Sequence, residues 1–192
     1  MNETIHQKIL IITAPSGAGK TSITRYLMKE FPVLQFSVSA ATRDARGTEK
    51  DGVDYYFIGM EAFKQKIKDK EFAEWEMVYE GKYYGTLKSE LQRIWGMDKV
   101  PVLDIDVKGA IHVQQQYPVN TLSIFIEPPS VNELQIRLQV RGTETDESIQ
   151  ARVNKASYEI SFKDQFDKVV VNDNLENACA NARELVSNFL AS

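Results

Sequence analysis

The chain has 192 residues, a length that suits one domain, or one core with insertions, and that allows a packed interior without disulfides. Its hydrophobic fraction of 43% and charged fraction of 26% exclude collagen-like and intrinsically disordered proteins. The 23 Lys and Arg residues against 27 Asp and Glu residues give a net charge of −4, which argues against a protein that coats nucleic acid or lies on an anionic membrane through its overall charge.

The expected location of the protein is cytoplasmic. No run approaches 18 uncharged apolar residues, and the N-terminal residues lack the basic stretch and apolar core of a signal peptide. The single cysteine, Cys179, cannot form an internal disulfide, which is consistent with a reducing compartment.

The first predicted element is a strand at 8–13, a continuous apolar run typical of a strand that is covered on both faces, as in a parallel sheet. A helix is expected after it, with Ile23 and Leu27 on its apolar face and Pro32 at its end. A second strand is expected at 36–40.

Residues 42–59 are polar and contain three glycines, and they interrupt this apolar rhythm. Within and after them we expect a short β-like patch at 55–57, a helix at about 60–70 and a strand at 72–78. The region therefore indicates a small inserted subdomain.

The rest of the chain alternates helices with buried strands, which predicts an α/β domain with a parallel sheet. Ser130 and Glu133 have the spacing of a capping box at a helix N-terminus. Helices are expected near 87–95, at 109–117, at 130–141, from about 145 and from 175, and strands at 100–106, 121–126 and 168–171.

The segment between the first strand and the first helix has the pattern of a phosphate-binding loop, because it ends in Gly19-Lys20-Thr21. In such a loop backbone N–H groups surround the phosphates, the lysine neutralises the β- and γ-oxygens, and the hydroxyl reaches Mg²⁺. The first position of the pattern is Ala14 instead of glycine. The residues of the loop that are predicted to bind a nucleoside triphosphate, which the resemblance described below makes ATP, are Ala14, Pro15, Ser16, Gly17, Ala18, Gly19, Lys20, Thr21 and Ser22.

The positions of the arginines indicate a nucleotide kinase among the enzymes that use such a loop. The Asn/Thr-Lys-x-Asp motif that a switch GTPase uses to read guanine is absent from the sequence. Pairs of arginines follow the second predicted strand and lie on a later helix, and a kinase needs such groups to bring a donor triphosphate and an acceptor monophosphate together. These arginines are Arg43, Arg46, Arg137, Arg141 and Arg152; the alternative for any one of them is a surface salt bridge.

Taken together, these segments resemble guanylate kinase over essentially the whole chain. The segments that carry the resemblance are 14–21, 36–47, 51–57, 71–75, 83–86, 103–109, 126–130, 137–144 and 171–175. The resemblance implies an α/β P-loop kinase fold with a five-stranded parallel core sheet flanked by helices, a small mixed α/β GMP-binding insertion and a helical lid. It divides the chain into a core (1–37, 91–129 and 156–192), the insertion (38–90) and the lid (130–155).

The implied reaction is that of an ATP:GMP phosphotransferase, which makes ADP and GDP with Mg²⁺, supplies GDP and GTP, and recycles GMP. Guanine offers an O6 acceptor and N1–H and N2–H₂ donors, so its pocket should hold a carboxylate and hydroxyl groups. The resemblance assigns Glu74, Ser39, Thr86 and Asp106 to the base, and Arg43, Arg46, Tyr55 and Tyr84 to the GMP phosphate. Glu49 follows Thr48 where the family often has a Gly-Glu pair, and we leave it outside the predicted set.

The same resemblance assigns the catalytic groups. Lys20, Arg43, Arg137, Arg141 and Arg152 would stabilise the transferring phosphoryl group, and no general base is needed because the attacking phosphate is already ionised. Asp104, at the end of an apolar run, would order Mg²⁺ through water together with Thr21. Asn172 would contact adenine.

Two alternatives remain for the function. Guanylate kinase-like domains also occur as inactive binding modules, typically with a degraded phosphate loop, and related enzymes phosphorylate other nucleoside monophosphates. The expected partners are ATP and GMP, with no nucleic acid and no membrane, and the sequence leaves the oligomeric state open.

Overall fold

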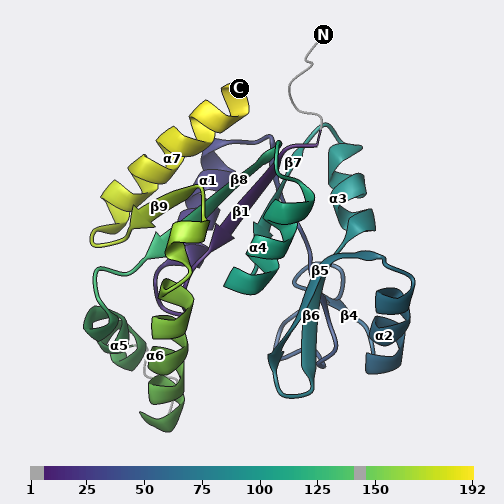
Figure 1. Cartoon of the computed structure of the whole chain (residues 1–192), viewed down its shortest axis with the longest axis horizontal. Coiled ribbons are helices and arrows are strands. Elements are labelled where there is room, and N and C mark those ends of the chain that lie inside the picture. Colours follow the sequence, from purple (N-terminus) through teal and green to yellow (C-terminus); the bar gives the residue numbers. More distant parts are fainter. Residues whose placement is uncertain (1–6, 141–145) are drawn as a thin grey trace.

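A computed structural model describes residues 7–140 and 146–192 of the chain. Its centre is a parallel sheet of five strands in the order β2-β7-β1-β8-β9 (Figure 1). The middle strand pairs on both sides, with Leu10 opposite Val102 on one neighbour and opposite Leu122 on the other. This confirms the predicted five-stranded parallel sheet. The strands are β1 (Ile9–Thr13), β2 (Leu34–Phe36), β7 (Val100–Asp104), β8 (Thr121–Glu127) and β9 (Lys168–Val171).

Helices cover both faces of this sheet, as the apolar run at 8–13 predicted. On one face Leu10 and Ile12 pack in a cluster with α1 (Lys20–Glu30) and α7 (Leu175–Ala191). On the other face Ile9 and Ile11 pack with α3 (Lys88–Trp95) and α4 (Val107–Gln116). Alternate residues of β1 therefore belong to two different hydrophobic clusters, and all five are buried.

The insertion forms its own mixed sheet, with the order β4-β3-β6-β5. Figure 1 shows it beside the core, with α2 on its outer side. Its hydrophobic cluster is small and contains four buried residues, Ala40, Phe63, Phe72 and Leu87. The elements are β3 (Ala40–Ala41), β4 (Tyr56–Phe57), α2 (Met60–Lys68), β5 (Phe72–Tyr79) and β6 (Lys82–Leu87).

Two sequence predictions about strands were wrong, and one strand was missed. The strand expected at 36–40 is divided between the sheets: β2 ends at Phe36, and β3 begins at Ala40. Strand β6 was not predicted, although the turn before it has Gly81 at a φ of 69°. The run at 100–106 stops being a strand at Asp104, because the Asp106 side chain caps α4 by accepting a hydrogen bond from the Gly109 N–H (2.9 Å).

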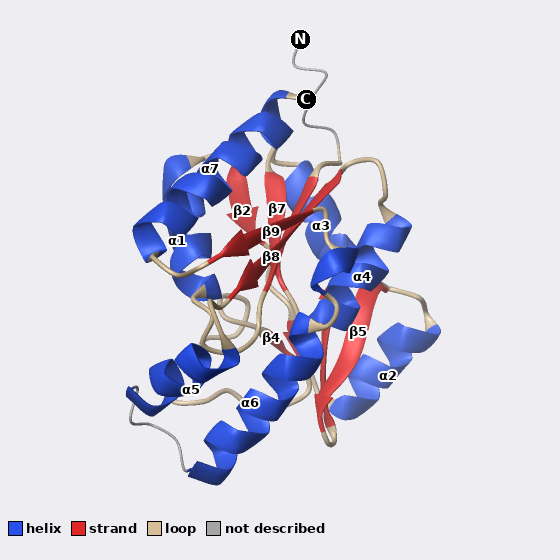
Figure 2. Ribbon diagram, turned by 60° about the vertical axis from the view of Figure 1, so that its left-hand side comes forward, coloured by secondary structure: helices blue, strands red, loops and turns tan. Residues whose placement is uncertain are grey.

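The remaining helices are α5 (Val131–Val140) and α6 (Asp146–Ile160), followed by a short 3₁₀ turn at Lys163–Gln165. Helices α5 and α6 pack on each other through Leu134, Leu138 and Val153, below the core sheet in the view of Figure 2. Half of the predicted capping box forms, since the Glu133 N–H donates to Ser130 Oγ (3.0 Å). Within the described ranges, none of the helices has the length and apolar character needed to cross a membrane.

Candidate active site

The phosphate loop connects the end of β1 to the first turn of α1, as its pattern predicted. Gly17 and Gly19 adopt φ values of 93° and 98°, a region that favours glycine. Positive φ values outside glycine occur, in the described part of the chain, at Gln7, Lys70 and Asp98. Ala14 therefore lies in an ordinary backbone conformation, and its departure from the pattern introduces no strain.

Asn172 supports the loop from the end of β9. It is 4% exposed, and its Nδ2 donates to the Ala18 carbonyl (2.7 Å). A Cβ atom at Gly19 would overlap the Asn172 amide, so glycine is required there for close approach as well as for its φ. Asn172 thus holds the loop through its amide, and its Oδ1 has no hydrogen-bond partner in the structure.

A cavity of about 450 Å³ lies between the phosphate loop, the end of β7, the insertion sheet and α6. At its phosphate-loop end Lys20 forms an ion pair with Asp104, and Thr21 lines the wall beside them. The predicted site residues that line this one cavity are Ala14, Pro15, Ser16, Gly17, Gly19, Lys20, Thr21, Ser22, Ser39, Arg43, Arg46, Tyr55, Glu74, Tyr84, Asp104, Asp106 and Arg152.

Glu74, on β5 of the insertion sheet, lines the same cavity and is 5% exposed. Thr86 lies opposite it in the β5-β6 register, and the Thr86 hydroxyl donates to Glu74 Oε1 (2.6 Å). Burial raises the pKa of Glu74 to about 7, and the charge of Asp106 acts in the same direction. Thr86 is completely buried behind Glu74, so the structure places its hydroxyl as a support for the carboxylate.

Arg43 also lines the cavity, and all three nitrogens of its guanidinium donate hydrogen bonds. Its Nε donates to the Tyr84 hydroxyl (3.0 Å), and its Nη1 and Nη2 donate to the two Glu49 oxygens (2.6 and 2.8 Å). The guanidinium carbon also lies 4.9 Å from the ring centre of Tyr55. These bonds lower the pKa of Glu49 to about 2, aided by the Arg46 N–H. Glu49 was left outside the predicted set of site residues, but it is bonded to Arg43, which belongs to that set.

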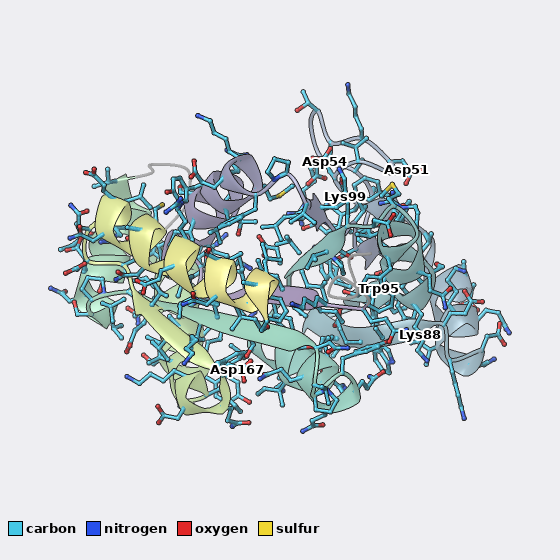
Figure 3. The ribbon with its side chains drawn as sticks, turned by 90° about the horizontal axis from the view of Figure 1, so that it is seen from above. Asp51, Asp54, Lys88, Trp95, Lys99 and Asp167 are labelled. Atoms are coloured by element: carbon cyan, nitrogen blue, oxygen red, sulfur yellow. The ribbon has the colours of Figure 1, made fainter. Side chains whose placement is uncertain are left out.

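The loop before Tyr55 is held by two aspartates, which Figure 3 labels. Asp51 Oδ1 accepts a hydrogen bond from the Phe57 N–H (2.8 Å), and Asp54 Oδ2 accepts one from the Lys50 N–H (2.7 Å). These bonds fix the backbone on both sides of Tyr55. Burial raises the pKa of Tyr55, which keeps its hydroxyl protonated and able to donate.

Helix α6 closes the cavity from the side opposite the insertion. Arg152 Nη1 donates to Ser16 Oγ of the phosphate loop (2.5 Å). Six further residues that line the cavity were not predicted: Glu76 and Val78 on β5, Gly85 on β6, Ile105 after β7, and Lys155 and Glu159 on α6. The sequence signal that could have identified the last two is their helical spacing from Arg152, since i, i+3 and i+7 share one face.

A second cavity, also about 450 Å³, lies on the other side of the phosphate loop. Arg137 and Asn172 line it, and Arg137 Nη1 donates to the Asn172 carbonyl (3.1 Å). Three exposed apolar side chains, Ile136, Val140 and Leu175, complete its wall. Arg137 thus lies apart from Arg43 and Arg152, while Arg141 lies outside the described residues.

The oxygen donors suitable for a metal are few. Within 7–140 and 146–192 there is no group of three or more His, Cys, Asp or Glu side chains that could hold a metal ion. Thr21 and Asp104 are a hydroxyl and a carboxylate in the same cavity. This set fits Mg²⁺, which is usually bound by one or two carboxylates, substrate phosphates and water.

Comparisons with known proteins agree with this geometry. The guanylate kinase family model matches residues 6–189. The chain is 43% identical over 189 residues to guanylate kinase of Bacteroides fragilis, covering 98% of this chain and 93% of that protein, and 45% identical over 183 residues to that of Bacteroides thetaiotaomicron, covering 95% and 90%. A crystal structure of guanylate kinase from Anaplasma phagocytophilum superposes with a TM-score of 0.78 at 27% identity, over 99% of this chain and 89% of that one.

Proposed function

The chain belongs to the guanylate kinase family, and from this premise we propose that it transfers the γ-phosphoryl group of ATP to the phosphate of GMP, giving ADP and GDP. One observation carries the proposal. A single cavity is lined both by the phosphate loop with Lys20 and by the buried Glu74, whose carboxylate accepts a hydrogen bond from Thr86, and this suits a triphosphate donor beside a guanine-bearing acceptor.

The base is read by Glu74. An ionised carboxylate accepts two hydrogen bonds, which matches the adjacent N1–H and N2–H₂ donors of guanine, whereas adenine presents an unprotonated N1 at the same edge. A base without those donors would leave a buried carboxylate unpaired, which makes the discrimination large. Ser39 and Asp106 complete the polar lining, and Thr86 fixes the direction of the Glu74 carboxylate.

The GMP phosphate is held by Arg43, Arg46, Tyr55 and Tyr84. Arg43 is bonded to Glu49 on both terminal nitrogens, so an incoming phosphate has to replace part of that pairing. Because Tyr84 accepts from Arg43 Nε, its own hydroxyl proton remains available for the phosphate. These residues position the acceptor oxygens toward the phosphate loop.

Transfer depends on electrostatic stabilisation by cations. Lys20 exchanges its pairing with Asp104 for the phosphate oxygens, and Arg152 acts from α6, where it touches Ser16. Arg137 and Arg141 are also proposed to stabilise the negative charge of the transferring phosphoryl group. Thr21 directly and Asp104 through water would hold Mg²⁺, which supplies charge neutralisation at the donor phosphates when it is bound.

The donor base is assigned to the second cavity. Arg137 and the apolar side chains of Ile136 and Leu175 form a wall suited to a flat ring, and Asn172 contributes polar groups at its edge. The division into core (1–37, 91–129 and 156–192), insertion (38–90) and lid (130–155) is part of the same proposal. The roles in GDP and GTP supply and in GMP recycling, and the cytoplasmic location, stay predictions.

An assay of ADP release across GMP, AMP, CMP and UMP tests the function. We expect kcat/KM for GMP to exceed that for each other acceptor by at least about a hundredfold. Comparable activity with another monophosphate would identify a different kinase, and absence of turnover together with tight GMP binding would identify a binding module. Glu74→Ala should raise KM for GMP while leaving KM for ATP nearly unchanged.

A further inference from the structure

Two charged residues on α6 face the active cavity, and the reaction as described above does not use them. Lys155 and Glu159 are one helical turn apart, and Lys155 Nζ lies 3.6 Å from Glu159 Oε1. Both line the cavity that contains the phosphate loop. The Glu159 side chain is only 8% exposed, whereas that of Lys155 is 40% exposed.

Their place on the helix follows from Arg152. Arg152, Lys155 and Glu159 occupy positions i, i+3 and i+7, which share one face of an α-helix. The hydrogen bond from Arg152 to Ser16 places this face against the phosphate loop. The neighbouring face, with Val153 and Ala156, is packed on α5. Lys155 is thus directed toward the cavity, one turn nearer the core than Arg152.

Glu159 lines the same cavity as Lys20 and Asp106. The charges of Lys155, Asp106 and Lys20 all act on its carboxyl, while burial raises its pKa. Lys20 belongs to the phosphate loop and Asp106 to the acceptor side. The pair therefore shares one cavity with groups of the donor and of the acceptor side.

A buried carboxylate in a cavity for polyanions repels the substrates unless a cation stands between them. Lys155 can be that cation, because its chain is long and its ammonium is a compact point charge with three donors. A free lysine loses side-chain entropy when it is fixed on a ligand, and an anchoring carboxylate reduces that loss. In this pair Lys155 would supply the positive charge, and Glu159 would hold the Lys155 ammonium in place.

We propose that Lys155 contacts the phosphoryl group during its transfer and that Glu159 is a positioning residue, which acts by holding the Lys155 ammonium in the cavity. The inference rests on the proposed function and adds a cation to those named there. It concerns the transition state and not GMP binding, since Lys155 lies on α6, whereas the groups assigned to GMP lie on the insertion or, for Asp106, at the N-terminus of α4.

Substitution of Lys155 tests the first half. Lys155→Met should lower kcat by about 10- to 100-fold, as expected for loss of one group that stabilises transition-state charge, while GMP affinity measured by calorimetry stays within about twofold of wild type. Lys155→Arg should restore kcat to within about threefold, because it keeps the positive charge. The matched control is Lys163→Met, which removes the same charge from a surface pair with Glu127 (2.8 Å) and should leave kcat unchanged.

Substitution of Glu159 tests the second half. Glu159→Gln should lower kcat less than Lys155→Met does, and the double variant should match Lys155→Met alone, because the carboxylate acts through the lysine. Thermal unfolding of each variant identifies any that fails to fold; if Glu159→Gln is one of them, the Lys155→Met and Lys155→Arg pair still decides the inference.

The inference and the proposed function fail in different ways. Wild-type activity with GMP together with a Lys155→Met kcat equal to that of Lys163→Met would overturn the inference alone. Additive losses in the double variant would overturn the positioning role of Glu159. A wild-type protein that does not phosphorylate GMP would overturn the function and the inference with it.

Discussion

The two sheets that enclose the cavity are held together by different forces. The core sheet has apolar strands that are buried on both faces between two hydrophobic clusters. The insertion sheet has a cluster of four buried residues, and two of its strands are two residues long. Because apolar burial supplies most of the stability of a sheet, the insertion has to depend more on polar contacts.

Glu90, at the start of α3, provides the densest of these contacts. It is 3% exposed, and its carboxylate accepts hydrogen bonds from the Val38 N–H (3.1 Å), the Tyr56 hydroxyl (3.0 Å) and the Arg93 Nε and Nη2 (2.8 and 2.7 Å). Val38 lies in the chain that enters the insertion and Glu90 in the chain that leaves it. One carboxylate therefore joins both connections to the core.

This difference separates the two tasks of the site. The phosphate loop follows the fully buried strand β1 of the core, whereas most of the residues proposed to bind the acceptor lie in the insertion, which has the smaller cluster. Chemistry should accordingly depend on charge at the core end, and acceptor binding on the polar framework of the insertion. Changes at each end should have separable effects on turnover, on binding and on stability.

The largest separable effect is expected at the core end. Lys20→Met should lower kcat by about a thousandfold, because it removes a cation from the transferring phosphoryl group, while the dissociation constant of GMP changes by less than about threefold. A coupled ADP-release assay measures the first quantity and calorimetry the second. Lys29→Met, on the exposed side of the same helix, is the control and should behave as wild type. Loss of GMP binding in Lys20→Met would contradict the division between the two ends.

The next effect concerns stability at the insertion end. The pKa of Glu74 is about 7 in the folded protein, whereas an unburied glutamate has a pKa of 4.5. Between pH 4.5 and pH 7 the folded state therefore retains a proton that the unfolded state has released. Stability is therefore greatest below pH 4.5 for this group and falls as pH rises through 7, by about 3 kcal/mol in total. Glu49 contributes with the opposite sign, but its low pKa confines that contribution to pH values below about 4.5.

Urea unfolding of the ligand-free protein at pH 5 and pH 8 measures the contribution of Glu74 to the free energy of unfolding. We expect the wild-type free energy of unfolding to fall relative to that of Glu74→Gln by about 2 to 3 kcal/mol between the two pH values. Glu76→Gln, on the same strand but only half-buried, should show a smaller difference. Parallel pH dependences for wild type and Glu74→Gln would mean that the carboxyl stays ionised without ligand.

The core could be predicted from the sequence because its signal is local and strong. The run at 8–13 appears as a buried central strand, and the phosphate loop follows it in the predicted place. In the insertion the strands are short and their burial depends on partners distant in the chain. Strand β6 was missed for this reason, since Tyr83, Tyr84 and Gly85 show no clear alternation of apolar and polar residues.

The site was predicted more fully than its internal contacts. Glu74 and Thr86 were both named, but their cross-strand pairing depends on the β5-β6 register, which the sequence did not reveal. Glu49 was set aside on a family pattern, although it bonds to Arg43. Lys155 and Glu159 resemble ordinary charges of an amphipathic helix until Arg152 fixes which face meets the cavity.

The smallest expected effect tests the polar framework of the insertion itself. Glu90→Gln replaces an oxygen acceptor by an amide donor that faces Arg93, and it should lower the free energy of unfolding by about 2 kcal/mol, because charge-assisted bonds to a buried group are lost. Glu61→Gln is a matched control: Glu61 also lies in the first turn of an insertion-side helix with a cation three residues later, but its side chain is 90% exposed. That exposed pair should contribute less than about 0.5 kcal/mol.

Hydrogen exchange shows which strands lose amide protection in the Glu90→Gln variant. In Glu90→Gln, amide protection should fall over β3, β4 and β6 and stay unchanged over β1 and β7, because Glu90 bonds to Val38 and Tyr56 and not to the central strands. KM for GMP should rise while KM for ATP stays within about twofold. A uniform loss of protection across both sheets would instead show that the insertion and the core unfold as one unit, and that the carboxylate stabilises them jointly.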